Sequence, residues 1–379
     1  MPAQYRAEIV GSFLRPPDVL EAHEAYAQGR LALDRLRAVE DQAILNLLNV
    51  ERQVGLDVMS DGEYRRGAWA GDFQESVDGY VPGAPPIVLS WHRDTESGPI
   101  PVAPSLGMSQ AAGSVVIGEK LRRRRRLTEH EASFLQAHAQ GAFKVTMPAP
   151  SYVVARGYKP GVTDRAYPSR AAVLKDAVAI IQAEIKALVA EGVPYIQLDN
   201  PHYPDYIPED RRAQMRSIGI DPDQAIREDV EADNEALTGF DRSQVTLAMH
   251  LCRGNGGSAG WHTEGSYERI AEQVLGGIHV DRFLLEYDSQ RAGGFEPLRF
   301  VPKGTTVVLG LVTTKSGEIE SPELILRRID EASRQVDVEH LAVSPQCGFA
   351  SVIEGNPLTL DQQRRKLELV VEVARKVWG

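Results

Sequence analysis

The chain has little of the material from which several classes of protein are built. Its 379 residues include only two cysteines, too few for a disulfide framework. No run approaches the roughly 18 consecutive apolar residues of a membrane-spanning helix, and the first residues carry no apolar signal core. Positive charge is in deficit, with 42 Lys plus Arg against 53 Asp plus Glu. We therefore expect a cytoplasmic protein that keeps its cysteines as thiols and binds neither nucleic acid nor a membrane.

What the chain does have is a repeated pattern of short apolar runs, most of them followed by an amphipathic stretch. Continuous apolar runs are typical of strands that are buried on both faces, as in parallel sheets. Eight strand-then-helix units predict an α/β fold, a (β/α)8 TIM barrel over residues 1–379, with a doubly wound open sheet as the alternative. The predicted strands are 5–12, 56–61, 143–147, 195–199, 245–251, 282–287, 306–311 and 340–343, and the clearest helices are 34–54, 171–191 and 360–378.

One long insertion, residues 67–140, separates the second and third units of this pattern. It contains a candidate hairpin around 114–118 and five consecutive arginines, Arg122 to Arg126. Because acidic residues flank the arginines in an acidic chain, we interpret them as a solvated face or a subunit contact and assign them no function.

Polar residues stand at or just after the ends of the predicted strands: Ser12, Asp61, Asp199, His250, Glu286 and Ser344. In (β/α)8 barrels the carboxyl ends of the strands carry the active site. Residues that are far apart in the sequence can therefore meet there.

Both cysteines belong to this group of positions. His250 and Cys252 are two residues apart at the end of a strand, so their side chains point to the same side. Cys347 follows the eighth predicted strand and Glu286 ends the sixth. A single buried cysteine or histidine is usually structural, but one imidazole, two thiols and one carboxylate at the same barrel end form a set of ligands that suits Zn²⁺.

Six short motifs carry a resemblance to a known family. The chain resembles the catalytic barrel of cobalamin-independent methionine synthase, and more closely the short single-barrel bacterial relatives of that enzyme. The motifs follow the family's order over most of the chain: Val-Gly-Ser-Phe at 10–13, Asp-Gly-Glu at 61–63, Gln-Leu-Asp at 197–199, His-Leu-Cys at 250–252, Leu-Glu at 285–286 and Pro-Gln-Cys-Gly at 345–348.

The resemblance implies an activity like that of 5-methyltetrahydropteroyltriglutamate-homocysteine methyltransferase, a zinc enzyme that methylates homocysteine. It implies zinc ligation by His250, Cys252, Glu286 and Cys347. Zinc ionises bound thiols, and this makes a poor nucleophile reactive at neutral pH.

The same resemblance implies how homocysteine is bound. Its amine is expected on Glu63 and Asp199, and its carboxylate on Val10, Gly11 and Ser12. Two structural alternatives remain open at this point. Glu63 could instead pair with a neighbouring arginine, Arg65 or Arg66, and Asp199 could cap a helix.

The methyl donor is less clearly indicated, because two family features are absent. The stretch 147–152 lacks the tryptophan that stacks on the pteridine, although Tyr152 is a candidate substitute. Lys315 stands where the family has a histidine acid, so we take Lys315 as the candidate catalytic residue. The donor is either 5-methyltetrahydrofolate or a methyl-corrinoid such as methylcobalamin, the latter carried by a corrinoid protein that docks at a wide, shallow mouth.

Two other functions stay open. One is alkyl transfer to another thiol, as in epoxyalkane:coenzyme M transferase, although two carboxylates near a sulfonate would repel it. The other is a structural or stored zinc in a barrel that binds proteins. The sequence does not indicate the oligomeric state.

Overall fold

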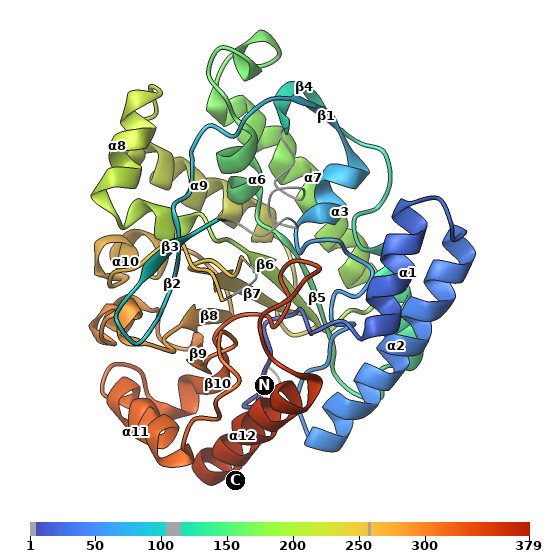
Figure 1. Cartoon of the computed structure of the whole chain (residues 1–379). Helices are drawn as coiled ribbons and strands as arrows, with labels where there is room; N and C mark the ends of the chain where they lie inside the picture. The colour runs from blue at the N-terminus through green and yellow to red at the C-terminus, as the bar shows by residue number, and fades with distance from the viewer. Residues whose placement is uncertain (1–4, 104–114, 257–258) are drawn as a thin grey trace.

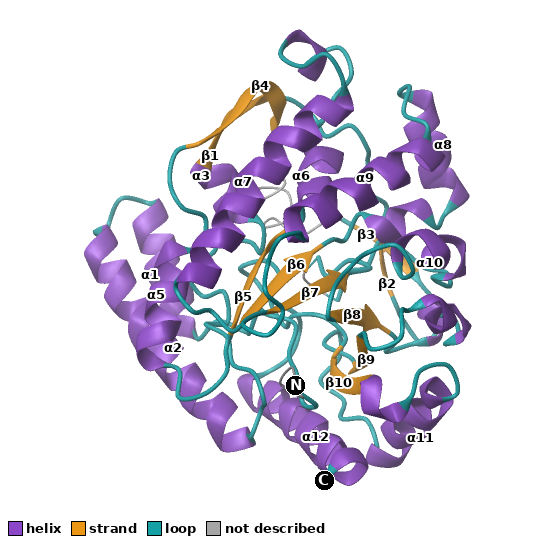
Figure 2. Cartoon of the chain, turned by 180° about the vertical axis from the view of Figure 1, so that it is seen from behind, coloured by secondary structure: helices purple, strands orange, loops and turns teal. Residues whose placement is uncertain are grey.

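A sheet of six parallel strands lies at the centre of the molecule, and helices surround it (Figures 1 and 2). The computed structural model describes residues 5–103, 115–256 and 259–379. The strands lie in the order β10-β9-β8-β7-β6-β5, and every neighbouring pair is parallel. All of their residues are buried except the first residue of β9, which explains their continuous apolar sequences. The bounds are Lys144–Pro148 (β5), Tyr195–Asp199 (β6), Thr246–Leu251 (β7), Arg282–Glu286 (β8), Thr306–Val312 (β9) and Leu341–Pro345 (β10).

The first two predicted strands are extended segments that continue this sheet at its two edges. Ala7 forms a parallel bridge with Val343 of β10, and Met59 forms one with Phe143, next to β5. The two segments also meet, because the Asp57 N–H donates to the Ala7 carbonyl at 3.1 Å. The prediction of a mixed α/β fold with a parallel sheet is confirmed, and the other six predicted runs agree with β5 to β10 within two residues.

A buried group of charges ties the first segment to the sheet. Glu8 accepts a hydrogen bond from Lys144 Nζ of β5 at 3.1 Å, and its other oxygen lies 2.6 Å from the Arg282 guanidinium of β8. All three side chains are almost fully buried. Because buried charges are tolerated only when they are paired, these contacts fix the segment against strands from both halves of the sheet.

Helices follow most of the strands, and the three predicted ones correspond to α2, α7 and α12. At the start of α12, Thr359 and Gln362 form a capping box in which each side chain accepts from the other residue's backbone N–H. No helix of the described residues is long and apolar enough to cross a bilayer. The helices are α1 (Pro17–Ala27), α2 (Leu33–Val54), α3 (Gly71–Ser76), α5 (Glu129–His138), α6 (Pro150–Gly157), α7 (Arg170–Ala190), α8 (Glu209–Ser217), α9 (Pro222–Leu237), α10 (Glu268–Val274), α11 (Pro322–Ser333) and α12 (Leu360–Trp378), with short 3-10 turns at Thr163–Arg165, Tyr203–Tyr206, Gln290–Ala292, Glu296–Phe300 and Val338–His340.

The insertion forms two small antiparallel pairs of strands. In one, β1 (Val77–Pro82) pairs with β4 (Val115–Arg123); in the other, β2 (Trp91–Arg93) pairs with β3 (Ile100–Val102). The hairpin predicted around 114–118 is wrong, because residues 115–118 belong to β4, whose partner β1 comes much earlier in the chain. Ser114 lies outside the described residues.

The arginine run lies at the end of β4 and just after it, among acidic residues. Arg124 Nε is 3.0 Å from Asp78 on β1, Arg125 is 3.4 Å from Glu75, and Arg126 is 3.0 Å from Glu184 on α7. These pairs hold the insertion against its own strand and against α7. They agree with the interpretation of the run as a solvated face, and the alternative of a subunit contact stays a prediction.

Candidate functional site

Four side chains of the kinds that bind metals meet at the carboxyl ends of the central strands. His250 lies near the end of β7 with Cys252 directly after that strand, Glu286 ends β8, and Cys347 follows β10. Their ligand atoms all lie within 4.8 Å of one another, and the two Sγ atoms are 3.5 Å apart. The structure thus brings together the four residues that the sequence analysis predicted as ligands.

His250 and Glu286 are each oriented through one atom and leave a second atom unused. His250 Nδ1 is 3.1 Å from the Leu284 carbonyl, which can only accept, so the proton is on Nδ1. Glu286 Oε1 accepts from the Arg253 N–H at 2.9 Å. Among the described residues, His250 Nε2 and Glu286 Oε2 are buried with no hydrogen-bond partner. Such atoms are costly to bury, and both are therefore suited to bind an ion.

The cluster can hold one positive charge of its own: burial opposes it, but the Cys347 sulfur raises the pKa of His250 to about 9. One imidazolium does not balance the three acidic groups around it. Burial and, after it, the nearby Cys347 sulfur together raise the pKa of Glu286 to about 7. The Cys347 sulfur, together with burial, also raises the pKa of Cys252. Two thiols and a carboxyl group cannot all ionise this close together unless a further cation lies among them.

Two further carboxylates lie beside the cluster. Glu63 Oε1 accepts from Thr146 Oγ1 at 2.9 Å, and Asp199 Oδ1 accepts from Gln197 Nε2 at 2.8 Å. Burial raises the pKa of each carboxyl to about 7. A cation bound beside them would lower both pKa values again.

Glu63 is placed by an unusual turn. It adopts a left-handed backbone with φ of 58°, directly after Gly62 with φ of 67°. Its N–H donates to Asp61 Oδ1 at 2.9 Å, which stabilises the turn. A Cβ on Gly62 would lie 2.5 Å from Leu47 Cδ2, so only glycine fits. The Asp-Gly-Glu motif therefore builds the turn that presents the Glu63 carboxylate.

The arginine neighbours of Glu63 are mostly engaged elsewhere. Arg65 donates to Asp41 at 2.7 Å, and Arg66 Nε donates to Glu131 at 2.6 Å. Arg66 lies 3.7 Å from Glu63, which is an ion pair without a hydrogen bond. The alternative role of Glu63, an ion pair with a neighbouring arginine, is present only in this loose form.

The capping role considered for Asp199 belongs to its neighbour. Asn200 Oδ1 accepts from the His202 N–H at 3.0 Å and so closes the turn after β6. Gln197, which holds Asp199, also donates to the Val10 carbonyl at 2.8 Å. Asp199 is thus fixed to the first segment of the chain.

The first segment approaches the cluster through Val10, Gly11 and Ser12. Val10 and Ser12 line the cavity described below. A Cβ on Gly11 would lie 2.7 Å from Glu63 Oε1, and a Cβ on Gly348 would lie 2.0 Å from Ser12 Oγ. The two glycines allow the three loops to pack this closely.

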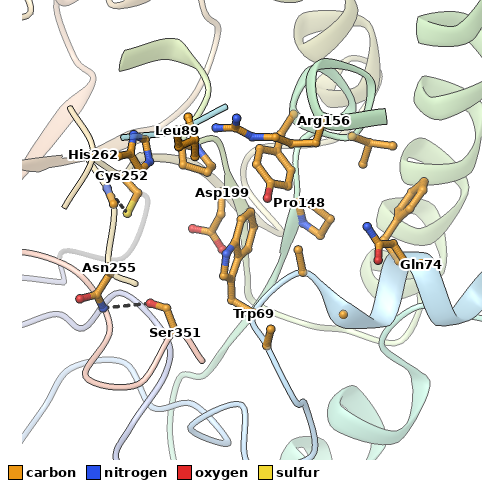
Figure 3. Close-up of a pocket in the computed structure, with 18 of the residues that line it drawn as sticks. Trp69, Gln74, Leu89, Pro148, Arg156, Asp199, Cys252, Asn255, His262 and Ser351 are labelled. Carbon is orange, nitrogen blue, oxygen red and sulfur yellow. Dashed lines mark hydrogen bonds between the residues drawn. The ribbon is translucent and has the colours of Figure 1, made fainter. Parts of the chain in front are cut away.

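A cavity of about 330 Å³ opens onto the cluster (Figure 3). Its lining is apolar apart from a few polar groups, as is typical of small-molecule sites. Glu286, in contrast, is fully buried. The floor of the cavity comprises Ser12, Glu63, Asp199, His250, Cys252 and Cys347.

The walls of this cavity come from the insertion and from α6. Trp69 and Tyr152 face each other with ring centroids 4.7 Å apart and planes at 49°. The insertion lines the cavity above the cluster, on the side where a wide, shallow mouth was expected of a chain without a second barrel. The only sequence signal was that two of four tryptophans fall in the insertion. Other wall residues are Phe73, Tyr80, Val88, Trp91 and Arg156.

The insertion is fastened to the loop that follows Cys252. His92 on β2 and Trp261 exchange two backbone hydrogen bonds of 2.8 Å. Trp261 Nε1 also donates to Asp94 at 2.9 Å. The wall and one side of the floor are therefore mechanically connected.

His262, in the same loop, is a pocket residue that the sequence analysis did not select. Its ring meets Trp91 edge-on at 5.0 Å, and Nδ1 is 2.8 Å from Thr263 Oγ1. Burial lowers its pKa to about 3, so the imidazole is neutral at physiological pH.

Lys315 is engaged by the same loop. Its Nζ donates to the carbonyls of Gly254 and Gly260 at 2.8 and 3.1 Å and lies 3.3 Å from Asn255 Oδ1. These contacts use the three protons of the ammonium group. The geometry therefore makes Lys315 an anchor of the loop, and its catalytic role stays a prediction.

Comparisons with known proteins agree with this arrangement. A family model described as the catalytic domain of cobalamin-independent synthase matches residues 6–376. Uncharacterized protein YxjH of Bacillus subtilis is 36% identical over 383 residues, 99% of this chain and 95% of the relative. A putative vitamin-B12 independent methionine synthase from Listeria monocytogenes has a similar structure, with a TM-score of 0.75, 28% identity and coverage of 100% of this chain and 99% of that one. A B12-independent methionine synthase from Shewanella sp. W3-18-1, in complex with selenomethionine, shares the fold, with a TM-score of 0.71, 20% identity and coverage of 99% and 98%.

Proposed function

The chain belongs to the family of the cobalamin-independent synthase catalytic domain, and on this premise we propose that it is a zinc-dependent methyltransferase that methylates the thiol of homocysteine to form methionine. The observation that carries the proposal is the cluster of His250, Cys252, Glu286 and Cys347, of which His250 and both cysteines line the floor of one cavity. Membership of the family already indicates a methionine synthase-like methyltransferase. What we propose in addition is the metal, the substrate and the residues that bind them.

The four side chains fit zinc by their chemistry and by their unused atoms. His250 Nε2 and Glu286 Oε2 are buried without partners in the described structure, and two thiols complete the set. We propose that these four residues hold the ion. Zinc bound there would keep the cysteines and a substrate thiol ionised near neutral pH.

Homocysteine is proposed to lie along the floor of the cavity. Glu63 and Asp199 would bind its ammonium group, which needs converging carboxylates. The segment Val10–Gly11–Ser12 would bind its carboxylate through N–H and hydroxyl donors. This places the substrate thiol at the cysteine cluster, because all of these residues line or adjoin one cavity.

The family's independence of cobalamin favours 5-methyltetrahydrofolate over a methyl-corrinoid as the donor. The walled cavity supports the same choice, since the insertion occupies the space where a corrinoid protein was expected to dock. We therefore withdraw the corrinoid protein as a partner and propose a free methyl-folate in its place.

We also propose that residues 1–379 form one closed (β/α)8 barrel with residues 67–140 as an insertion. Support comes from the bridges that join the sheet edges to the first two segments and from the contact between Asp57 and Ala7. Glu8, which contacts β5 and β8 together, fits the interior of such a ring.

Two other functions receive less support. A sulfonate thiol, as in epoxyalkane:coenzyme M transferase, would meet the carboxylates of Glu63 and Asp199 in the same cavity. Structural zinc sites are closed by four ligands, whereas this cluster borders a cavity large enough for a substrate.

The test is a methyl-transfer assay on the zinc-loaded protein. Homocysteine and coenzyme M are offered as acceptors, with 5-methyltetrahydrofolate and methylcobalamin as donors in parallel. The proposal expects methionine from homocysteine and 5-methyltetrahydrofolate. Methylation of coenzyme M alone, or no methylation of homocysteine by either donor, would refute it.

A further inference from the structure

One wall of the cavity is aromatic and faces the floor on which the thiol is proposed to lie. Trp69 comes from the insertion and Tyr152 from α6, yet their rings are only 4.7 Å apart. Figure 3 shows the indole of Trp69 in the middle of the pocket, beside Asp199 and Pro148. The indole and the cysteine cluster therefore line the same cavity.

The position of Trp69 is set by the same loops that carry the floor residues. Its N–H donates to the Ser351 carbonyl at 3.1 Å, in the loop that follows Cys347. Its carbonyl accepts from Arg66 at 3.0 Å, three residues after Glu63. A residue held at both its N–H and its carbonyl by these two loops is pre-organised relative to the reacting thiol.

Polar groups elsewhere in the cavity lining suit the edge of a heteroaromatic ring. Gln74 lines the cavity, and its side-chain amide makes no hydrogen bond to another described residue, so the amide has a donor and an acceptor to offer. Arg156, also in the lining, is held at 2.8 Å by Asp205. An apolar face with a polar amide at the side matches a ring whose faces are apolar and whose edge carries N–H and carbonyl groups.

Resting on the proposed function, we infer that Trp69 is the residue on which the heteroaromatic ring of the methyl donor lies, with Tyr152 beside it. The insertion thereby supplies the donor site within this one chain. Trp69 acts as a positioning residue that holds the donor methyl group over the cysteine cluster. Its distance from other aromatic wall residues in the sequence explains why no local motif marks it.

The experiment compares Trp69→Ala and Trp69→Phe with Trp378→Phe as the matched control. Trp378 lies on α12, where its Nε1 donates to the Val338 carbonyl, away from the cavity. Binding of 5-methyltetrahydrofolate to each zinc-loaded protein is measured by calorimetry, and steady-state kinetics give KM and kcat for both substrates.

Loss of one stacking contact between an aromatic side chain and a heteroaromatic ring weakens binding by about ten- to a hundredfold. We expect Trp69→Ala to raise the donor Kd and KM by this factor, while the KM for homocysteine stays within about twofold of wild type. Trp69→Phe should recover part of the loss because it keeps an aromatic face. Trp378→Phe should leave every constant unchanged.

The inference is overturned if the donor Kd is unchanged in Trp69→Ala, if the KM for homocysteine rises equally, or if the wild-type protein does not bind 5-methyltetrahydrofolate. It is separable from the proposed function. Trp69-dependent binding without methylation of homocysteine would sustain the inference and refute the function. Methylation of homocysteine that Trp69→Ala leaves unchanged would support the proposed function and overturn the inference.

Discussion

The floor and the walls of the cavity are built in different ways. At the cluster, His250 of the floor and the fully buried Glu286 lie on β7 and β8, where backbone hydrogen bonds to a neighbouring strand on each side fix them. The walls come largely from the insertion, which has short strands and long connections, and from α6. The floor is rich in titratable groups, whereas the walls are mainly aromatic and apolar.

This difference indicates which part of the cavity activates the thiol and which part recognises the donor. Thiol activation requires several ligands to be held at fixed distances, and strand ends provide that rigidity. Recognition of a donor requires shape and apolar surface, which an insertion can supply without disturbing the sheet. Changes to the floor should therefore affect the acceptor and the metal, and changes to the walls should affect the donor.

The largest expected effect is on the floor, from Cys347→Ser. Zinc affinity should fall by more than about 100-fold, since even the groups behind metal ligands contribute 10–100-fold. Methionine formation should become undetectable. Zinc content after dialysis and the methyl-transfer rate check both, and a circular dichroism melting curve confirms that the variant is folded. Retention of zinc together with full activity would show that Cys347 is not a ligand.

Next in size is Asp199→Asn, which tests amine recognition. Removing one partner of a buried charge pair costs about 2–5 kcal/mol, so the KM for homocysteine should rise by about 30-fold or more. The donor KM should not change, because Trp69 and the other wall residues are untouched. Initial-rate kinetics with each substrate varied in turn measure both. A rise in the donor KM alone would contradict the division between floor and walls.

The strand ends are also the part of the site that the sequence predicted best. Six runs matched strands within two residues because strands buried on both faces must be continuously apolar. Cys252 and Cys347 could be placed together since the carboxyl ends of parallel strands converge, whatever their separation in the chain.

The walls could not be predicted, because their contacts join distant segments of the chain that show no periodic pattern of apolar residues. Trp69 and Tyr152 are in contact although they are far apart in the sequence, and β4 pairs with the distant β1 rather than within a local hairpin. The contacts of Lys315 with Gly254 and Gly260 likewise depend on how two loops pack. None of these contacts leaves a local pattern in the sequence.

A smaller effect should follow from pH. Burial raises the pKa of Glu63 and of Asp199 to about 7 in the metal-free site, and zinc bound beside them would lower both values, so in the zinc-loaded protein these carboxyls gain protons only below pH 7. A protonated carboxyl does not attract an ammonium group. The KM for homocysteine should therefore rise below pH 7, by up to about tenfold per pH unit for each carboxyl, and level off above pH 8.

This dependence is measured from about pH 5 to 8.5 with the zinc content monitored at each point, so that the range covers carboxyl pKa values lowered by zinc. Glu63→Gln provides the control, since it should raise the KM and flatten part of the pH dependence. A KM that does not change over this range in the wild-type protein would show that these carboxylates do not bind the amine.

The smallest effect is expected from Lys315→Gln. Hydrogen bonds from a charged group contribute about 1.5–3 kcal/mol, so the free energy of unfolding should fall by about 2 kcal/mol as the loop loses its anchor. The pH dependence of kcat should keep its shape. Urea unfolding and a kcat–pH profile test this pair of outcomes. Loss of a limb of that profile, with stability unchanged, would instead identify Lys315 as a proton donor.

The most direct test of the central claim is X-ray absorption at the zinc edge, with and without homocysteine. The account predicts two sulfur and two nitrogen or oxygen ligands in the protein alone, from Cys252, Cys347, His250 and Glu286. On addition of homocysteine it predicts a third sulfur in place of the oxygen. A coordination sphere that homocysteine leaves unchanged would contradict the account, because the floor would then hold a closed, structural zinc.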